Sequence, residues 1–421
     1  MIPNPARLRG FAQRSWELLG ASALVGIVTG LLVAGAEKLT LNLLEWVQGL
    51  PVWAVVAAPA VGLVLAALAL RYLAFRAAPG LADTWLRAFH DPNEDMKART
   101  APGGVVASLC TIGFGGAMGL EGLSIFTGGA VGTVIQDRLR WLFGSIDAKV
   151  LMTAGAAAGV AAIFKAPATG ALFAIEVPFT DDFAPRKLLP CLVAGATGYL
   201  GFAAVNGTTP LFEAHGHVGF EASTLIGALG LGVVGGLGAR LFSRLIGFAK
   251  SLTRRYSLPV RIAGAAATTA ALLVVSRLAT GRNLTLGPGY DAISWALKPN
   301  RAVPVLLLIL VLRCLATAAA TAGGGAGGLF IPLVVAGALL GRATGNLFGR
   351  AEDTMFLIVG IAAFLGAGYR VPLTAVMFVA ETSGRATYVV PALLAAVVAD
   401  LMMGKQCVTA YQRSRIEPAS A

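Results

Sequence analysis

Long stretches without an ionisable side chain constrain this chain more than any other feature of its sequence. Five of them hold no Asp, Glu, Lys or Arg: residues 18–36, 46–70, 188–212, 222–239 and 314–341. About 20 apolar residues in a helix cross the hydrocarbon core of a bilayer. Charged residues make up only 13% of the chain, roughly half of their share in soluble proteins. The sequence therefore predicts an all-helical integral membrane protein with several spans.

The positions of the basic residues predict the orientation of the chain. Lys and Arg gather near the N-terminus, in 240–261 and after residue 404, and cytoplasmic segments carry such an excess. Residues 188–239 hold neither. We therefore expect both termini in the cytoplasm and an external linker between two membrane halves. The predicted order is a cytoplasmic amphipathic helix, the first half, the linker, the second half and a cytoplasmic helix or tail: 1–20, 21–204, 205–221, 222–403 and 404–421.

The same composition argues against several other functions. The net charge of +12 follows the orientation of the spans, so it does not indicate nucleic-acid binding. The four cysteines and three histidines lack the spacing of a metal site, so no metal or cofactor is expected. An intramembrane enzyme needs a nucleophile beside a base, and Ser124 and Thr127 near Glu121 are too weak a basis for one. We expect no enzymatic activity.

The two halves resemble each other. Residues 154–176 match residues 359–381 at a constant shift of 205, with eight identities in 23 positions. A set of glycines that includes Gly119 and Gly328 aligns at a shift of 209. Because the linker is expected outside and both termini inside, the halves should have opposite orientations. Inverted repeats of this kind place their substrate sites near the middle of the membrane.

Several apolar segments are interrupted within the expected membrane. Breaks marked by glycine lie at 78–80, 119–122 and 327–332. Non-helical backbone at this depth is tolerated only where protein buries it or where it lines a watery cavity. A helix start presents unpaired N–H groups and the positive end of its dipole, which suits an anion. The three breaks therefore predict an anion path.

Glu121 lies at one of these breaks. An ionisable carboxylate in a membrane segment is costly and usually functional. The alternative is a structural ion pair, but no partner is evident nearby in the sequence. A carboxylate at a helix start would compete with an anion for the same N–H groups, and its protonation or displacement would free them. We therefore interpret Glu121 as a gate.

These motifs resemble those of the CLC family of chloride channels and transporters over nearly the whole chain. GLEGL at 119–123 is similar to the family's GREGP motif, whose Glu is the external gate, and GLFIP at 328–332 is similar to its GxFxP motif. APGLA at 78–82 occupies the place of GSGIP. The resemblance implies a prokaryotic homodimer in the inner membrane, with one pore in each subunit and two inverted repeats of tilted and broken helices. It also implies the residues that contact the anion: Pro79, Gly80, Gly119, Leu120, Gly122, Gly328, Leu329, Phe330, Ile331 and Val408.

Departures from the family pattern bear on the mechanism. Pro79 and Val408 stand where the family has Ser and Tyr hydroxyls, and Tyr411, three residues further on, would restore the second hydroxyl if the alignment shifted by one turn. Proton-coupled members carry an internal Glu at the position of Val177, which has no titratable group. Lys165 is a basic residue that the family does not usually carry there. It is either a structural cation paired with a carboxylate or a cation in the pore.

We expect the chain to transport chloride or a similar small anion through a pore gated by Glu121. Because Val177 cannot carry a proton, a passive channel is the favoured mechanism. A proton/chloride antiporter of the same family is the first alternative, and an exporter of fluoride or another anion is the second. Pro79 also resembles nitrate-preferring members, so nitrate should permeate. A cation-coupled transporter would need several midplane acids, and only Glu121 lies in an otherwise apolar segment.

Overall fold

The computed structural model of the chain describes residues 5–75, 78–91, 96, 98–139, 149–212, 222–350 and 353–414, without the side chains of residues 5–15. Within these ranges the regular secondary structure is helical, as predicted. The helices are α1 (Pro5–Gln48), α2 (Val52–Tyr72), α3 (Leu81–His90), α4 (Ala101–Gly113), α5 (Glu121–Arg138), α6 (Val150–Phe164), α7 (Pro167–Glu176), α8 (Leu188–Asn206), α9 (Ala222–Arg255), α10 (Leu258–Thr280), α11 (Tyr290–Leu297), α12 (Val303–Ala322), α13 (Phe330–Leu347), α14 (Met355–Tyr369), α15 (Pro372–Ser383) and α16 (Val389–Met403). Short 3₁₀ helices add Ala98–Thr100, Pro185–Lys187 and Ala386–Tyr388.

Long helices form an apolar outer layer around short central ones. In the described part of the chain, eight helical segments are long and apolar enough to cross a membrane. The outer faces of α1, α2, α9 and α10 expose large hydrophobic side chains, among them Leu31, Leu68, Leu241 and Leu278. By contrast, every residue of α6 and α14 is buried. The protein is thus a multi-pass membrane protein whose short helices lie inside a lipid-facing shell.

The helix bounds add detail to the expected segments. Helix α1 continues without a break through residue 20, so the expected N-terminal helix and first span are one element. The uncharged stretch 314–341 holds the end of α12 and most of α13, with a break between them. Helix α10 also qualifies as a span, although Arg261 and Arg277 interrupt its apolar pattern. The described residues 404–414 form no helix. Linker residues 213–221 lie outside the described residues.

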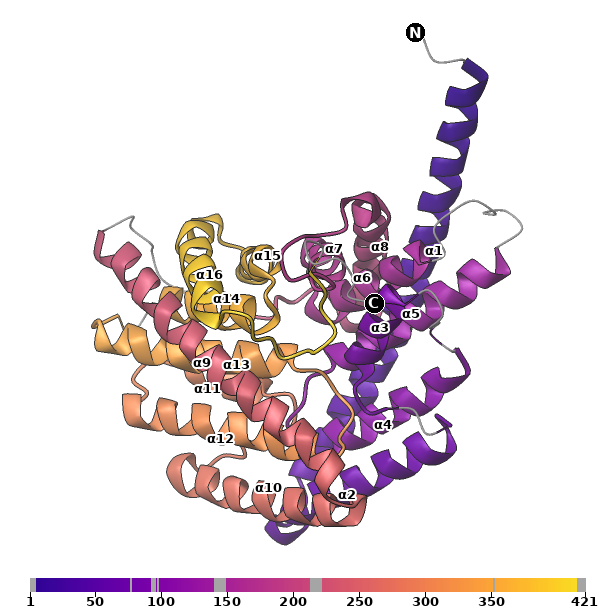
Figure 1. Cartoon of the computed structure of the whole chain (residues 1–421). Coiled ribbons are helices and arrows are strands. Elements are labelled where there is room, and N and C mark those ends of the chain that lie inside the picture. Colours follow the sequence, from indigo (N-terminus) through magenta and orange to yellow (C-terminus); the bar gives the residue numbers. More distant parts are fainter. Residues whose placement is uncertain are drawn as a thin grey trace.

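The two halves repeat one unit of local structure. Figure 1 shows α1–α8, coloured indigo to magenta, beside α9–α16, coloured salmon to yellow. Lys165 directly follows α6 and Arg370 directly follows α14, and both C-cap residues lie in the left-handed region with φ of 54° and 57°. This backbone conformation is uncommon for residues with a Cβ. Helices α7 and α15 then begin at Pro167 and Pro372, so the repeat found in the sequence is confirmed.

The halves hold each other together through helix caps. Glu176, the last residue of α7, accepts hydrogen bonds from the N–H groups of Leu373 (3.1 Å) and Thr374 (2.8 Å) at the start of α15. The Thr374 hydroxyl donates to the same carboxylate. In the other direction, Glu381 of α15 accepts from Ala168 N (2.9 Å), Thr169 N (2.8 Å) and Thr169 Oγ1 (2.6 Å) at the start of α7. Buried hydrogen bonds to a charged group are among the stronger ones, so these caps fix α7 against α15.

Glycines allow neighbouring central helices to touch backbone to backbone. A Cβ on Gly128 of α5 would overlap the carbonyl oxygen of Gly155 on α6, and a Cβ on Gly155 would overlap that of Gly128. Gly337 of α13 and Gly360 of α14 make the equivalent reciprocal contact. Small residues permit this close approach in membrane helices. The structural repeat therefore includes the contact between α5 and α6 and the matching contact between α13 and α14.

Replacing Gly128 by Ala should destabilise the fold by about 3 kcal/mol or more, because the added methyl meets rigid backbone rather than a flexible side chain. The midpoint of thermal unfolding in detergent measures the effect. Gly230→Ala on α9 is the matched control, since no heavy atom lies within 4 Å of its Cβ position. Equal midpoints for the two variants would contradict the proposed helix contact.

Candidate anion site

The two broken segments meet at the centre of the protein. Gly119, before α5, and Gly328, before α13, form an antiparallel bridge with hydrogen bonds of 2.9 Å from Gly119 N to Gly328 O and 2.8 Å in return. A Cβ on Gly122 would lie 2.7 Å from the carbonyl carbon of Gly327, so only glycine fits. Leu120 and Leu329 are the N-cap residues of α5 and α13. Two helix starts from opposite halves are therefore brought together.

The side chain of Glu121, the first residue of α5, lies at the start of α13. It is fully buried, and one carboxylate oxygen accepts a hydrogen bond from the N–H of Phe330. A Cβ on Gly119 or Gly328 would overlap this carboxylate, so both glycines make room for it. The carboxylate thus lies where a bound anion would be expected, at the positive end of a helix.

One oxygen of this carboxylate has no partner. Within the described residues, Glu121 Oε2 is buried and makes no hydrogen bond. A buried charged oxygen without a partner is unfavourable. The Glu121 side chain is therefore held less completely than Glu176 and Glu381, whose carboxylates also accept a threonine hydroxyl. This difference would allow Glu121 to leave its position more easily.

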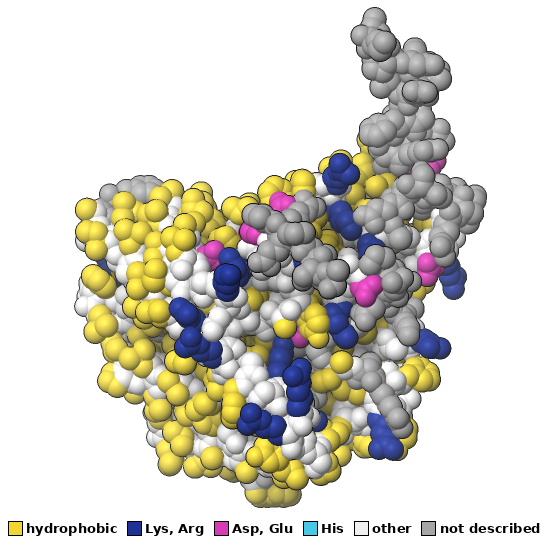
Figure 2. Space-filling view, viewed as in Figure 1, with side chains coloured by type: hydrophobic (Ala, Val, Ile, Leu, Met, Phe, Trp, Pro, Cys, Tyr) yellow, Lys and Arg dark blue, Asp and Glu magenta, His cyan; other side chains and the backbone are white. Residues whose placement is uncertain are grey.

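A cavity of about 930 Å³ leads toward this centre from one face of the protein. Pro79, Gly80, Gly328, Leu329 and Val408 line it, so five of the residues implied by the resemblance share one space. Basic side chains also line the cavity: Arg71, Lys250, Arg254 and Arg261. Figure 2 shows the face that carries the C-terminal segment, with many Lys and Arg side chains and few Asp and Glu. The cavity is therefore positively charged.

Tyr369 is a residue of this site that the sequence analysis missed. It is the last residue of α14, is 4% exposed and lines the same cavity. Leu329 of the α13 start lines this cavity as well. The Tyr369 ring packs against Phe330 at a centroid distance of 6.3 Å. In the repeat alignment Tyr369 matches Phe164, and this extra hydroxyl was the only sequence signal.

The C-terminal segment brings Val408, not Tyr411, beside Tyr369. Val408 N donates to the carbonyl of Gly368 (3.0 Å), and Gln412 Nε2 donates to the carbonyls of Tyr369 (2.6 Å) and Val177 (2.9 Å). Tyr411 also borders the cavity, but it is 38% exposed and stacks under the guanidinium of Arg87 at 5.4 Å. A tyrosine that shares the cavity with Leu329 is thus supplied by a helix other than the expected segment. Val177 itself is buried and apolar.

Lys165 contacts the segment that follows α8. Its Nζ donates to the carbonyl of Thr209 (2.9 Å) and lies 6.0 Å from the ring centre of Phe202. Its charge also acts on Glu37 of α1. Lys165 is not among the residues that line the charged cavity. Lys165 therefore lies away from this cavity, and its role stays a prediction.

The equivalent break of the second half is closed. Pro288 and Gly289 match Pro79 and Gly80 at the shift of 209. The Arg313 guanidinium fills the space there and donates to the carbonyls of Leu286 (3.1 Å), Gly287 (3.0 Å) and Pro288 (2.7 Å). The two repeat-related breaks therefore differ. The break at Gly80 borders an open cavity, and the break at Gly289 is filled by the Arg313 side chain.

Comparisons with known proteins agree with these features. The sequence model of the family described as "Voltage gated chloride channel" matches residues 74–404. The H(+)/Cl(-) exchange transporter ClcA of Citrobacter koseri is 28% identical over 422 residues, covering 92% of this chain and 86% of that protein. ClcA of Salmonella typhimurium is 28% identical over 415 residues, covering 91% and 85%.

Solved structures share the fold. A slow cyanobacterial Cl-/H+ antiporter has a TM-score of 0.79 at 20% identity and covers 92% of this chain and 95% of its own. A CLC-type fluoride/proton antiporter has a TM-score of 0.80 at 22% identity, with 94% and 98% coverage. At these identities the likeness concerns architecture alone.

Replacing Lys165 by Met tests its role. The variant loses the bond to Thr209 but keeps a side chain of similar length. We expect a stability loss of at most about 1 kcal/mol, as for a partly exposed ionic contact, with unchanged anion flux per reconstituted protein. A severalfold fall in flux from a stably folded variant would instead identify a pore cation.

Proposed function

Because this chain belongs to the voltage gated chloride channel family, we propose that it moves small monovalent anions across a membrane and exchanges them for protons. One observation carries the proposal: the Glu121 carboxylate, from one half, accepts a hydrogen bond from the N–H of Phe330, the first residue of α13, from the other half. A charged group in this place blocks an anion. A neutral or displaced one leaves the donors free.

Exchange is better supported than the passive channel that Val177 suggests. The matching relatives are named H(+)/Cl(-) exchange transporters, and Glu121 is a group that can carry a proton as well as gate the anion. The absence of a carboxylate at Val177 then means that protons reach Glu121 by another path, such as water in the cavity beneath it. We propose that the charged cavity and both termini face the cytoplasm, in agreement with the distribution of basic residues.

Coupling is tested by reconstitution into vesicles. With chloride at a high concentration on one side, wild-type protein should drive protons uphill in the opposite direction, read by a pH electrode beside a chloride electrode. The same vesicles with nitrate in place of chloride test whether nitrate permeates, as expected for Pro79, and fluoride tests the exporter alternative. Chloride flux without proton movement would contradict exchange and support the passive-channel mechanism.

Glu121→Gln should remove both the gate and the coupling. Glutamine keeps the shape but is always neutral, so it cannot compete as an anion or deliver a proton. Wild-type flux should rise as pH falls, because protonation neutralises the carboxylate, whereas the variant should transport at all pH values without moving protons. Glu176→Gln is the control, since that carboxylate caps α15 and should affect stability only. A Glu121→Gln variant that kept the wild-type pH response would refute the assignment.

The Tyr369 hydroxyl should contribute to anion binding. Tyr369→Phe keeps the ring contacts with Phe330 but loses one hydrogen-bonding group, which should weaken chloride binding about three- to tenfold. Isothermal titration calorimetry of the purified protein measures the affinity. Tyr388→Phe is the matched control, because its hydroxyl pairs with Thr354 instead. Equal affinities in the two variants would exclude Tyr369 from the site.

We also propose the homodimer that the resemblance implies, with one complete path in each subunit. Both halves of the path lie within one chain, since Gly119 and Gly328 pair directly. Cross-linking in the membrane should yield a two-chain species. A protein that is active only as a monomer would contradict this arrangement.

A further inference from the structure

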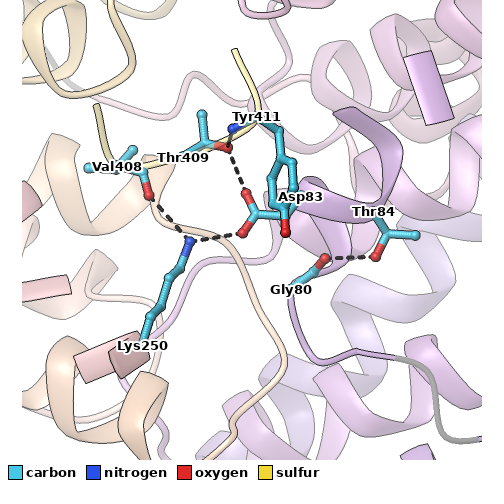
Figure 3. Close-up of polar contacts among 7 residues, drawn as sticks. All are labelled: Gly80, Asp83, Thr84, Lys250, Val408, Thr409 and Tyr411. Carbon is cyan, nitrogen blue, oxygen red and sulfur yellow. Dashed lines mark hydrogen bonds and ion pairs between the residues drawn. The ribbon is translucent and has the colours of Figure 1, made fainter. Parts of the chain in front are cut away.

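A second carboxylate occupies anion donors at the mouth of the cavity. Asp83, in the first turn of α3, accepts from Lys250 Nζ of α9 (2.8 Å) and from the hydroxyl of Thr409 in the C-terminal segment (2.7 Å). Figure 3 shows the three side chains converging from three separate parts of the chain. An ammonium group and a hydroxyl are also suitable ligands for a small anion. The carboxylate of Asp83 thus takes the place that such an anion could take.

Each donor has a second contact besides Asp83. Lys250 Nζ also donates to the carbonyl of Val408 (3.3 Å), and Thr409 Oγ1 accepts from Tyr411 N (3.4 Å). Both donors are therefore tied to the C-terminal segment, as the dashed lines in Figure 3 indicate. These contacts keep one link from each donor to the C-terminal segment that does not involve Asp83.

The Asp83–Lys250 pair is accessible and weakly held. The side chain of Lys250 is 38% exposed and that of Asp83 is 19% exposed. Partly exposed ion pairs contribute little to stability and are screened by salt. An anion that enters the cavity can therefore compete with Asp83 for Lys250.

The location places this cluster on the path to Glu121. Asp83, Lys250 and Thr409 line the same cavity as Leu329 and Tyr369. Among the described lining residues Asp83 is the only carboxylate, against four basic side chains. The charge of Asp83 also acts on Tyr369, as does that of Glu121. An anion in this cavity therefore shares its space with this group.

We propose that Lys250 and Thr409 form a binding site for a small monovalent anion at the cavity mouth, with Asp83 as a displaceable carboxylate that competes for it. The inference rests on the proposed function and deepens it, because the path then has two competing carboxylates. Glu121 competes for backbone N–H groups in the centre, and Asp83 competes for side-chain donors at the mouth.

The alternative role of the pair is to tether the C-terminal segment to α3. The two roles predict different changes in chloride affinity when Asp83 and Lys250 are replaced. Asp83→Asn removes the competing charge and leaves Lys250 free, so chloride should bind about threefold tighter or more. Lys250→Met removes the anion's ligand, so chloride should bind about threefold weaker or more. A tether predicts that both variants shift chloride binding in the same direction, because each one breaks the same ion pair.

Isothermal titration calorimetry with chloride on the purified full chain measures these affinities, and vesicle flux is recorded for the same preparations. Lys405→Met is the control for long-range charge, because Lys405 does not line this cavity. Lys250→Arg should bind like wild type, which shows that the position tolerates substitution.

Opposite shifts for Asp83→Asn and Lys250→Met, both larger than the shift of Lys405→Met, support the site. Shifts in one direction, or none, overturn it whether or not the vesicles transport. A wild type that transports chloride while the two variants shift together defeats this inference alone. A wild type that neither transports nor binds chloride defeats the proposed function as well.

Discussion

The structure depends on one constraint: a helix that begins inside a membrane must find partners for its first N–H groups. In this protein three such helix starts receive a carboxylate from the opposite half. Glu176 caps α15, Glu381 caps α7, and Glu121 lies on α13. Because each cap joins the two halves, the charges that satisfy the broken helices also hold the repeats together. The anion-binding chemistry and the stability of the fold therefore come from the same interaction.

The three carboxylates differ in how completely they are bound. Glu176 and Glu381 each accept two backbone hydrogen bonds and a threonine hydroxyl. Glu121 has no equivalent hydroxyl, and one of its oxygens lacks a partner within the described residues. A fully satisfied buried carboxylate is fixed, whereas an incompletely satisfied one is held less firmly. The same arrangement thus provides two structural caps and one group suited to move.

Repeat symmetry alone does not make a path. The central breaks pair symmetrically through Gly119 and Gly328, but the outer breaks differ. Gly80 borders an open, basic cavity, whereas the mirror position near Gly289 is filled by the Arg313 guanidinium and its carbonyl partners. In the described part of the chain, the two repeat-related outer breaks therefore differ, one beside an open cavity and the other filled by Arg313. The charged cluster of Asp83, Lys250 and Thr409 lines that open cavity.

The sequence by itself determined the membrane class, the inverted repeat, the helix breaks and Glu121. These features follow from local chemistry: long uncharged stretches avoid water, Pro and Gly mark where helices start or touch, and a buried acid is costly anywhere. Helix α10 was missed because Arg261 and Arg277 interrupt its apolar pattern. Only the tertiary structure showed that Tyr369 lines the same cavity as Leu329, that Lys165 binds the carbonyl of Thr209, and that Lys250 meets Asp83. Residues far apart in the chain share a site through packing, and packing is decided by the whole set of helix contacts rather than by any local pattern.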